Sequence, residues 1–384
     1  MIPPPSLRED LPTGRQAPPK LGGDKYIIMS PKVFIIITTW NSERFLSDLF
    51  LSLQKIDYPK SDWSLVVVDN GSKDKTLEIL RSWQVKMLNF STVIENKENK
   101  GFVVGYNQGI EYALKNKTDY IVVMNDDIIL EADWLNKMIE VMEKDKSIGI
   151  TQPMITKYPE KNKINSFGNS YHFLGFGFSQ GGEMTMKNYF AKNRNANYEP
   201  AYISLATAVM RGETLRKIGL LDPNYFTYHE DTDISFRARL YGWKLLVVVN
   251  SIVHHNYTFP AKKNKRRYFW LEKNRIYLML KFFKLKTLLL ILPAGLVMEI
   301  GLILFSIARG FAWQRLKAHG WILFNLPKIL KVRREVQKNR QFGDDKLYEF
   351  MTGKIEFQEI DNLLLKYIGN PILNLYFKFI KKFI

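Results

Sequence analysis

Short apolar runs that each end in polar residues constrain this chain more than any other feature. The runs cover residues 33–38, 65–68 and 120–124, and segments with helical spacing, such as 43–55 and 103–115, separate them. A continuous apolar run of this length is typical of a strand buried on both faces of a sheet. Strands that alternate with helices form parallel βαβ units. The sequence therefore predicts an α/β fold with a Rossmann-like, mixed and mostly parallel sheet.

Polar side chains follow these strands where they end: Thr39 after the first, Asp69 after the second and Asp127 after the third. In such sheets ligands bind beyond the carboxyl ends of the strands, so we expect the three residues to converge on one edge. Carboxylates there can hold a hard divalent cation that also contacts phosphate oxygens. Each cluster alone is a weak signal, because Asp and Asn are common in turns and Asp69 can equally cap the next helix.

The alternation of strands and helices breaks down after residue 150. Residues 165–182 are rich in Gly, Phe and Ser, and residues 183–200 are polar, which predicts a mobile loop. Order resumes with predicted helices near 212–219 and 231–241 and a strand at 244–249.

Three carboxylates, those of Glu230, Asp231 and Asp233, crowd the start of one of these helices. Repulsion between such neighbours raises the pKa of at least one of them, which suits a general base. The alternative is a solvated helix start, where acidic side chains interact favourably with the helix dipole. His254 and His255 end the following strand. A neutral imidazole there can bind a metal, although a pair of histidines is more often structural.

Composition narrows the classes of function. The chain has 384 residues and no cysteine, which rules out disulfides, thiolate metal sites and cysteine nucleophiles. The net charge of +18 is concentrated at one end, since residues 261–384 hold 25 Lys and Arg against nine Asp and Glu. These basic residues are interleaved with aliphatic and aromatic runs, which favours a membrane surface as partner and argues against nucleic acid.

Residues 287–308 form the longest apolar stretch, which only Pro293 and Glu299 interrupt. A helix of this length can span a bilayer, but a glutamate at its middle is costly in lipid. Three interpretations stay open: a transmembrane span, an in-plane or re-entrant segment, and a buried helix of a helical subdomain. Residues 371–384 place aromatic and aliphatic residues on one face and lysines on the other, as in helices that lie at a membrane interface.

The first 30 residues are rich in Pro, Gly and charge, and are predicted to be a disordered arm. They contain no apolar stretch of the secretory type. Met29 lies just before the first strand, so Met1 and Met29 are both candidate translation starts.

Several stretches, taken in order, carry a specific resemblance. They are Thr38–Asn41, Val66–Ser72, Asn99–Gly109, Asn125–Asp127, Ile218–Asp222 and Phe226–Asp233, with Arg237 and Gly242-Trp243. Together they resemble glycosyltransferase family 2, which has the GT-A fold, and more narrowly its rhamnosyltransferase-like branch. The resemblance runs from residue 32 to about residue 280, and its motifs are highly specific in combination.

The resemblance implies a set of site residues. Those implied to bind the nucleotide-sugar donor are Thr39, Asn41, Asp69, Asn99, Gly101, Asn107, Asn125 and Asp126. The acidic motif of the family is Asp-x-Asp, or Asn-x-Asp in this branch, so Asp127 is implied as a metal ligand and Asp126 takes the variable position. His254 matches the metal-binding histidine of the family better than His255 does. Asp231, which follows Glu230 in a Glu-Asp pair, is implied as the catalytic base.

The implied enzyme is an inverting glycosyltransferase that uses Mg²⁺ or Mn²⁺. It would transfer a sugar, such as the deoxyhexose rhamnose, from a nucleoside-diphosphate donor to a saccharide or lipid-linked saccharide during cell-surface glycan synthesis. The GT-A domain would cover residues 31–260. The basic helical tail, residues 261–384, would hold it at a membrane surface with the catalytic domain in the cytoplasm.

Three rival functions are compatible with an α/β fold. A nucleotidyltransferase needs a Gly-rich phosphate loop after the first strand, and a dinucleotide-dependent oxidoreductase needs G-x-G-x-x-G there, but the sequence has Thr38-Thr39-Trp40-Asn41. A non-catalytic GT-A scaffold of a glycan-assembly complex stays open. The presence of Asp127, Asp231 and His254 argues against it.

Overall fold

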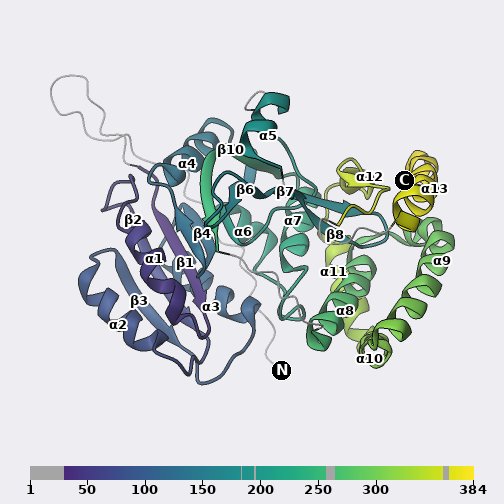
Figure 1. The fold of residues 1–384 in the computed structure, drawn as a ribbon, viewed down its shortest axis with the longest axis horizontal. Coiled ribbons are helices and arrows are strands. Elements are labelled where there is room, and N and C mark those ends of the chain that lie inside the picture. Colours follow the sequence, from purple (N-terminus) through teal and green to yellow (C-terminus); the bar gives the residue numbers. More distant parts are fainter. Residues whose placement is uncertain (1–29, 183, 194–195, 257–263, 358–362) are drawn as a thin grey trace. The chain divides into compact units, whose positions relative to one another are not determined.

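A mixed β-sheet runs through the middle of the protein in the computed structural model (Figure 1), which describes residues 30–182, 184–193, 196–256, 264–357 and 363–384. The main path of the sheet has the order β11-β7-β6-β9-β4-β1-β2-β3, and β5, β8 and β10 pair off this path. The strands are β1 (Val33–Thr39), β2 (Trp63–Asp69), β3 (Phe90–Glu95), β4 (Tyr120–Asn125), β5 (Ile128–Leu130), β6 (Ile148–Lys157), β7 (Ile164–His172), β8 (Gly177–Gly181), β9 (Thr207–Arg211), β10 (Lys244–His255) and β11 (Met351–Thr352). The end β3-β2-β1-β4 is parallel, and β9 joins it antiparallel. The predicted mixed α/β sheet is confirmed.

The apolar run of β1 is continuous because its side chains pack into two hydrophobic cores, one on each face of the sheet. Ile36 points into the core on one face of the sheet, and Ile35 and Ile37 point into the core on the other. Side chains alternate between the two faces of a strand, so covering both faces requires an apolar residue at every position. All seven residues of β1 are buried.

Helices cover both faces of the parallel end. The helices of the first 260 residues are α1 (Glu43–Leu53), α2 (Thr76–Lys86), α3 (Phe102–Lys115), α4 (Trp134–Lys144), α5 (Met186–Asn193), α6 (Gly212–Ile218) and α7 (Glu230–Leu240). One core packs α1 and α4 against the sheet, and the other packs α3 and α7 against the opposite face. Helix α3 comes close to β1, because a Cβ on Gly109 would lie 2.2 Å from Cγ2 of Ile36.

Part of the segment predicted as a mobile loop is a helix. Helix α5 occupies Met186–Asn193 inside the predicted loop at 183–200, and Tyr189 of this helix is buried in a small apolar cluster with Ile164 and Val247. Met186 and Phe190 of the same helix are half-buried against this cluster. The polar composition of the segment as a whole hid these few apolar contacts. The Gly-rich stretch before it forms the antiparallel pair β7 and β8.

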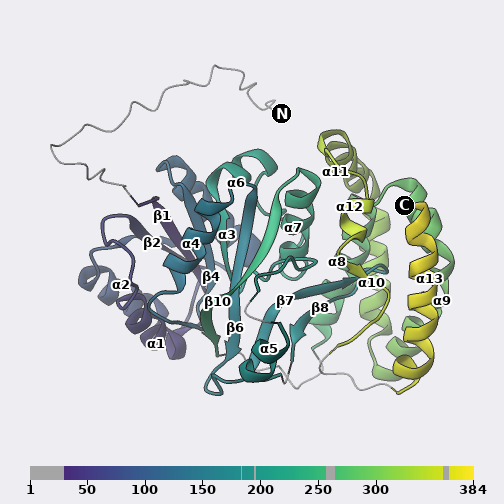
Figure 2. The same cartoon turned by 90° about the horizontal axis from the view of Figure 1, so that it is seen from above.

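The described residues from 264 onward form helices and the short strand β11 and pack onto the sheet domain, and Pro31–Ile384 is one compact unit. The helical segments are α8 (Lys265–Phe282), α9 (Leu285–Arg309), α10 (Ala312–Phe324), α11 (Leu326–Asn339), α12 (Asp345–Tyr348), the π-helix η1 (Leu365–Gly369), α13 (Asn370–Ile380) and the short 3₁₀ turn η2 (Lys381–Phe383). Phe282, Ile322 and Phe377 belong to the core that contains Ile36 of β1. In the view of Figure 2, α9 and α13 run along the outer edge of this helical region. Almost all of the predicted N-terminal arm lies outside the described residues.

Candidate active site

The carboxyl ends of the parallel strands meet at one edge of the sheet. Thr39 pairs in register with Asp69 on one side, and Thr38 pairs with Asn125 on the other. Tyr106 of α3 lies beside this edge, and its hydroxyl donates to Oδ1 of Asn125 at 3.4 Å. Burial raises the pKa of Tyr106 well above its usual value, and the nearby charges of Asp126, Asp127 and Glu230 raise it further. One phenol is thus close to both acidic clusters that the sequence singled out.

Asp69 is fully buried, and its carboxylate organises the turn that follows β2. Its Oδ1 accepts from the Thr39 hydroxyl at 3.2 Å and from the Ser72 hydroxyl at 2.5 Å. Its Oδ2 accepts from the amides of Gly71 at 3.1 Å and Ser72 at 3.0 Å. Asp69 therefore caps the turn before α2 and not the helix itself, which begins at Thr76, and its role in donor binding stays a prediction.

Three asparagines that were predicted to contact the donor form side-chain hydrogen bonds to backbone atoms in this structure. The Oδ1 atom of Asn41 accepts from the Lys73 amide at 2.8 Å, and that of Asn99 accepts from the Gly101 amide at 2.9 Å. Asn107 donates to the Leu221 carbonyl at 2.8 Å and accepts from the Leu221 amide at 3.0 Å. Asn107 therefore positions the chain before the acidic cluster, and its contact with the donor stays a prediction.

Gly101, at the start of α3, contacts Phe226 in the loop that leads into the acidic cluster. Its φ of +92° lies in the region that favours glycine, and a Cβ there would stand 2.5 Å from Cδ2 of Phe226. The ring of Phe226 in turn stacks on Trp270 of α8 with centroids 4.9 Å apart. A glycine is required here both by the backbone and by the ring packed against it.

The Asn125-Asp126-Asp127 turn follows β4, as the sequence predicted, and its three side chains have different surroundings. The Ser42 hydroxyl hydrogen-bonds to Asp126. Burial raises the pKa of Asp126 to about 6, with a smaller contribution from the charge of Asp127. Asp127 faces β10, and its carbonyl accepts from the Asn256 amide at 2.8 Å.

The structure corrects the choice between the two histidines at the end of β10. The Nε2 atom of His255 lies 3.1 Å from Oδ1 of Asp127. His254 is on the other face of the strand, where Nε2 lies 2.6 Å from Glu131 Oε1 and Nδ1 lies 2.6 Å from the Thr156 hydroxyl. Side chains alternate along a strand, so only one of two consecutive histidines can face Asp127. The geometry selects His255, although the motif match had favoured His254.

The acidic cluster begins helix α7, and its three carboxylates differ in role. Asp233 is fully buried and is bound by Nε of Arg237 at 2.7 Å and Nζ of Lys281 at 2.5 Å, so it forms a neutralised structural cluster. Glu230 is only 8% exposed. Burial raises the pKa of Glu230, and the charge of Asp231 raises it further; burial likewise raises the pKa of Asp231.

Asp231 is the more accessible member of the Glu230–Asp231 pair, since it is half-buried at the helix start. Its Oδ1 accepts from the Thr232 amide at 2.7 Å. This bond fixes the carboxylate without neutralising it. The pair therefore consists of two carboxylates with raised pKa values, of which Asp231 is accessible and Glu230 is buried.

The loop that leads into the acidic cluster is strained and is held by a residue that sequence reasoning missed. Phe226, Tyr228 and His229 all have positive φ, between 63° and 67°. Such conformations are costly for non-glycine residues and cluster at functional sites. Nδ2 of Asn274, from α8, lies within hydrogen-bonding distance of three carbonyls of this loop: those of Tyr225 at 3.2 Å, and of Thr227 and Tyr228 at 2.8 Å each. Asn274 is hard to single out from the sequence, because one asparagine within a basic helix resembles any polar surface residue.

Comparisons with known proteins agree with this geometry. Residues 34–219 match the family model described as glycosyl transferase family 2. A Methanococcus voltae enzyme, dolichyl N-acetyl-alpha-D-glucosaminyl phosphate 3-beta-D-2,3-diacetamido-2,3-dideoxy-beta-D-glucuronosyltransferase, is 30% identical over 115 residues, which cover 30% of this chain and 35% of that protein. The beta-monoglucosyldiacylglycerol synthase of Synechocystis is 22% identical over 271 residues, which cover 70% of this chain and 52% of that protein. The chain thus spans about a third to a half of the length of these relatives.

A solved structure of GalNAc-T7 with UDP, GalNAc and Mn²⁺ shares the fold, with a TM-score of 0.54 and 17% identity over 68% of this chain and 49% of that one. The GT-A-like fold that the sequence resemblance implied is therefore confirmed. The strand edge, the acidic turn and the matched family model agree with one another, and the chain carries a glycosyltransferase family 2 domain.

Proposed function

We propose that this glycosyltransferase is a metal-dependent inverting enzyme that transfers a sugar from a nucleoside diphosphate to a lipid-linked saccharide at a membrane surface. The observation that carries the proposal is the pairing of Asp127 with His255 at the same strand edge as the buried Tyr106 and the Glu230–Asp231 cluster. The resemblance to the rhamnosyltransferase-like branch favours a deoxyhexose such as rhamnose as the transferred sugar.

The chemistry of the Asp127–His255 pair fits a divalent cation. Nε2 of His255 lies 3.1 Å from Oδ1 of Asp127, and Nδ1 of the same ring lies 3.2 Å from Oδ1 of Asn165. An imidazole nitrogen and a carboxylate oxygen are both ligands for divalent cations, and an imidazole oriented through its other nitrogen is the usual arrangement at metal sites. Mg²⁺ or Mn²⁺ bound there would neutralise charge on the leaving nucleoside diphosphate.

Asp231 is the proposed base. It is accessible and held in place by the Thr232 amide, while burial and the charge of Asp231 raise the pKa of Glu230, which favours the protonated form of that carboxyl. The acceptor hydroxyl would lose its proton to Asp231 as its oxygen attacks the anomeric carbon, and the bond from that carbon to the phosphate oxygen would break on the opposite face. One such displacement inverts the anomeric centre.

The proposed acceptor is a lipid-linked saccharide. The name of the Methanococcus relative describes transfer to a dolichyl phosphate sugar, and that of the Synechocystis relative describes a glucosylated diacylglycerol. The chain itself carries a strongly basic, apolar C-terminal region, and α9 is long and apolar enough to enter a membrane. A membrane location with the catalytic domain in the cytoplasm would place the site where nucleotide sugars are made available.

A donor screen tests the proposal. Purified protein, with isolated membranes and either Mg²⁺ or Mn²⁺, is offered a panel of nucleotide sugars that includes dTDP-rhamnose, UDP-GlcNAc and GDP-mannose, and lipid extracts are examined by mass spectrometry. We expect one donor to give a mass increase of one sugar on a lipid-linked species. The Asp231→Asn protein is the matched control, because Asn caps a helix about as well as Asp but cannot accept the proton. Equal product from both proteins would contradict the proposal, and no transfer from any donor would favour the non-catalytic scaffold.

A further inference from the structure

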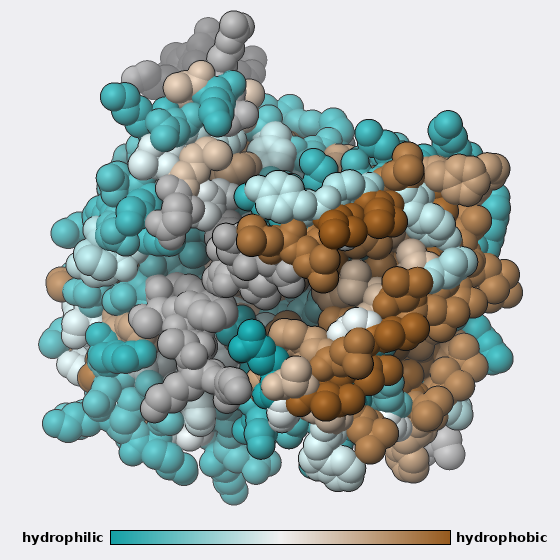
Figure 3. All heavy atoms as spheres, turned by 45° about the vertical axis from the view of Figure 1, so that its right-hand side comes forward, coloured by the Kyte–Doolittle hydropathy of each residue, from teal (hydrophilic) through white to brown (hydrophobic). Residues whose placement is uncertain are grey.

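One side of the helical region carries a continuous apolar surface that the fold leaves uncovered. We call it the α9–α13 face; Figure 3 shows hydrophobic residues gathered on this side. Its exposed members on α9 are Leu285, Leu289, Leu292, Leu296, Val297, Ile300, Ile303, Leu304, Phe305 and Ile307, and those on η1, α13 and the adjoining residues are Leu363, Leu364, Tyr367, Ile368, Ile372, Leu375, Phe379 and Phe383. Soluble monomers rarely expose apolar patches of more than a few hundred Å², and larger ones mark interaction sites.

Most of α9 is exposed, and seven of its exposed apolar residues form a stripe along the whole helix, which Val297, Leu304 and Phe305 widen. Leu285, Leu289, Leu292, Leu296, Ile300, Ile303 and Ile307 follow one another at spacings of three and four residues. The opposite side of the helix holds its buried residues, Thr287, Ile291 and Ser306. A transmembrane helix that stands alone meets lipid on all sides, whereas a stripe of this kind belongs to a helix with one side on protein and one on another phase.

The middle of α9 is fixed to the protein by a charged cluster. Oε1 of Glu299 lies 2.5 Å from Nη2 of Arg275 on α8, and its other oxygen is bound by Arg315 on α10. Both arginines also contact Glu272, at 2.7 Å and 3.0 Å. Arg275 further donates to the Leu174 carbonyl of the sheet domain at 3.2 Å. If α9 crossed a bilayer, this cluster would have to enter the hydrocarbon or come apart, and either is costly.

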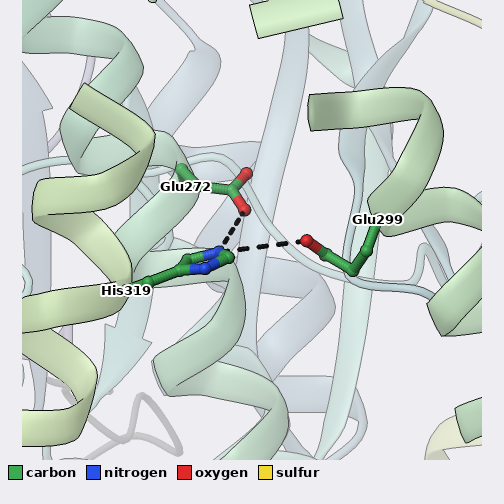
Figure 4. A group of neighbouring side chains, drawn as sticks. All are labelled: Glu272, Glu299 and His319. Atoms are coloured by element: carbon green, nitrogen blue, oxygen red, sulfur yellow. Dashed lines mark ion pairs between the residues drawn. The ribbon is translucent and has the colours of Figure 1, made fainter. Parts of the chain in front are cut away.

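Glu272, Glu299 and His319 approach one another closely enough to be considered as metal ligands (Figure 4), with Nε2 of His319 3.6 Å and 3.9 Å from the two carboxylates. The positive charge that a metal would supply is already present, because two guanidiniums neutralise the two carboxylates. We therefore interpret the group as an ion-pair cluster that anchors α9.

The C-terminal helix continues the same layer. The Tyr376 hydroxyl of α13 donates to the Leu290 carbonyl of α9 at 2.7 Å, while Phe377 and Ile380 pack inward. The helix predicted at 371–384 is thus divided between the core and the exposed surface. Both α9 and α13 expose apolar side chains on one side, and contacts with the rest of the protein fix their other side.

Basic residues surround the α9–α13 face. Lys284 and Lys286 begin α9 and Arg309 ends it, and Lys378, Lys381 and Lys382 lie on or just after α13; all are exposed. Anionic headgroups attract such side chains, while the apolar stripe enters the boundary between headgroups and acyl chains. An apolar surface of aliphatic and aromatic side chains with a basic edge matches the chemistry of an anionic lipid leaflet.

We infer that the α9–α13 face docks into one leaflet of an anionic bilayer, with α9 parallel to the membrane plane and not crossing it. The protein would then be monotopic, and its sheet domain would remain in water. Of the three interpretations of residues 287–308 that the sequence left open, this inference takes the in-plane one. The inference goes beyond the proposed activity and does not depend on which sugar is transferred.

Depth measurement with single cysteines tests the inference, and the chain suits it because it has no cysteine of its own. The variants Leu289→Cys, Leu296→Cys and Ile303→Cys sample both ends and the middle of the stripe, and Leu88→Cys places the same label on an exposed leucine far from it in the sequence. Each full-length protein carries a nitrobenzoxadiazole label and is added to phosphatidylcholine vesicles with 30 or 0 mol% phosphatidylglycerol. Lipids with quenchers at two acyl positions report the depth of each label.

We expect the three stripe labels to shift to the blue on anionic vesicles and to be quenched at one common, shallow depth, while the Leu88 label does not respond. Lys381→Gln with Lys382→Gln should weaken binding roughly tenfold or more at low salt, since each Lys near an anionic surface adds about fivefold. A deep label at the middle with shallow labels at both ends would show a span and overturn the inference. So would the absence of a shift at all three positions. No sugar transfer is measured, so these results are independent of the proposed reaction.

Discussion

Nδ2 of Asn274 lies 2.8 Å from the Tyr228 carbonyl, and through this contact a helix of the C-terminal region holds the strained turn before the acidic cluster. Lys273, next to it, binds the Asn224 carbonyl. Tyr277, one turn later, donates to Oδ2 of Asp222 at 2.7 Å. Helix α8 is therefore part of the machinery that positions Glu230 and Asp231.

Replacing Asn274 with Ala should slow sugar transfer tenfold or more while leaving donor affinity nearly unchanged. The substitution leaves three carbonyls without their shared donor, and the positive-φ residues can then relax. Loss of a buried hydrogen-bonding group costs roughly 1–3 kcal/mol of folding stability as well. Transfer rates and calorimetric donor binding measure the two effects. Asn325→Ala is the control, because the side-chain amide of Asn325 donates to the Trp321 carbonyl of α10, outside the loop before the acidic cluster.

The sequence predicted the sheet well, because each parallel strand is buried on both faces and so reads as an unbroken apolar run, as in β1 and β2. It predicted the acidic turn because polar residues end those strands. It could not predict which of His254 and His255 faces Asp127, since that depends on the pleat and on the pairing of β10 with β5 and β6. It also missed Asn274, whose role arises only when α8 folds back onto residues far away in sequence.

The two histidines can be told apart by metal binding. His255→Ala should weaken Mn²⁺ binding and lower transfer at a fixed Mn²⁺ concentration by a factor of ten or more, because it removes the proposed ligand beside Asp127. His254→Ala should retain Mn²⁺ affinity, because its two bonds go to Glu131 and Thr156. Electron paramagnetic resonance of free Mn²⁺ gives both affinities. The opposite order of effects would restore His254 as the ligand.

Glu299→Gln should destabilise the purified protein by roughly 1–3 kcal/mol, because it removes one of the two carboxylates that neutralise Arg275 and Arg315, in a partly exposed cluster. Denaturant unfolding measures the change. Glu335→Gln, at an exposed glutamate on α11, is the matched control and should change stability by less than about 0.5 kcal/mol. If Glu299→Gln is as stable as the parent protein, the cluster does not anchor α9.

The acid limb of the pH–rate profile should report the Glu230–Asp231 pair. A base acts only when ionised, so transfer falls as the pH drops through its pKa. Burial raises the pKa of Asp231, which places this limb at a higher pH than an ordinary aspartate would give. Asp231→Asn should bind donor normally and transfer sugar about 10²–10⁴-fold more slowly at every pH.

Glu230→Gln should keep most of the transfer rate and leave the acid limb where it is. A glutamine imitates the protonated Glu230 that burial favours, so Asp231 titrates in nearly the same surroundings. Asp233→Asn is a useful third variant, because Asp233 is bound by Arg237 and Lys281. This substitution should lower the stability of the protein and leave the acid limb of the pH–rate profile in place. If Glu230→Gln abolished transfer and Asp231→Asn did not, the roles of the two carboxylates would be exchanged. Glu230 would then be the base, reached by an acceptor that enters from the buried side of α7.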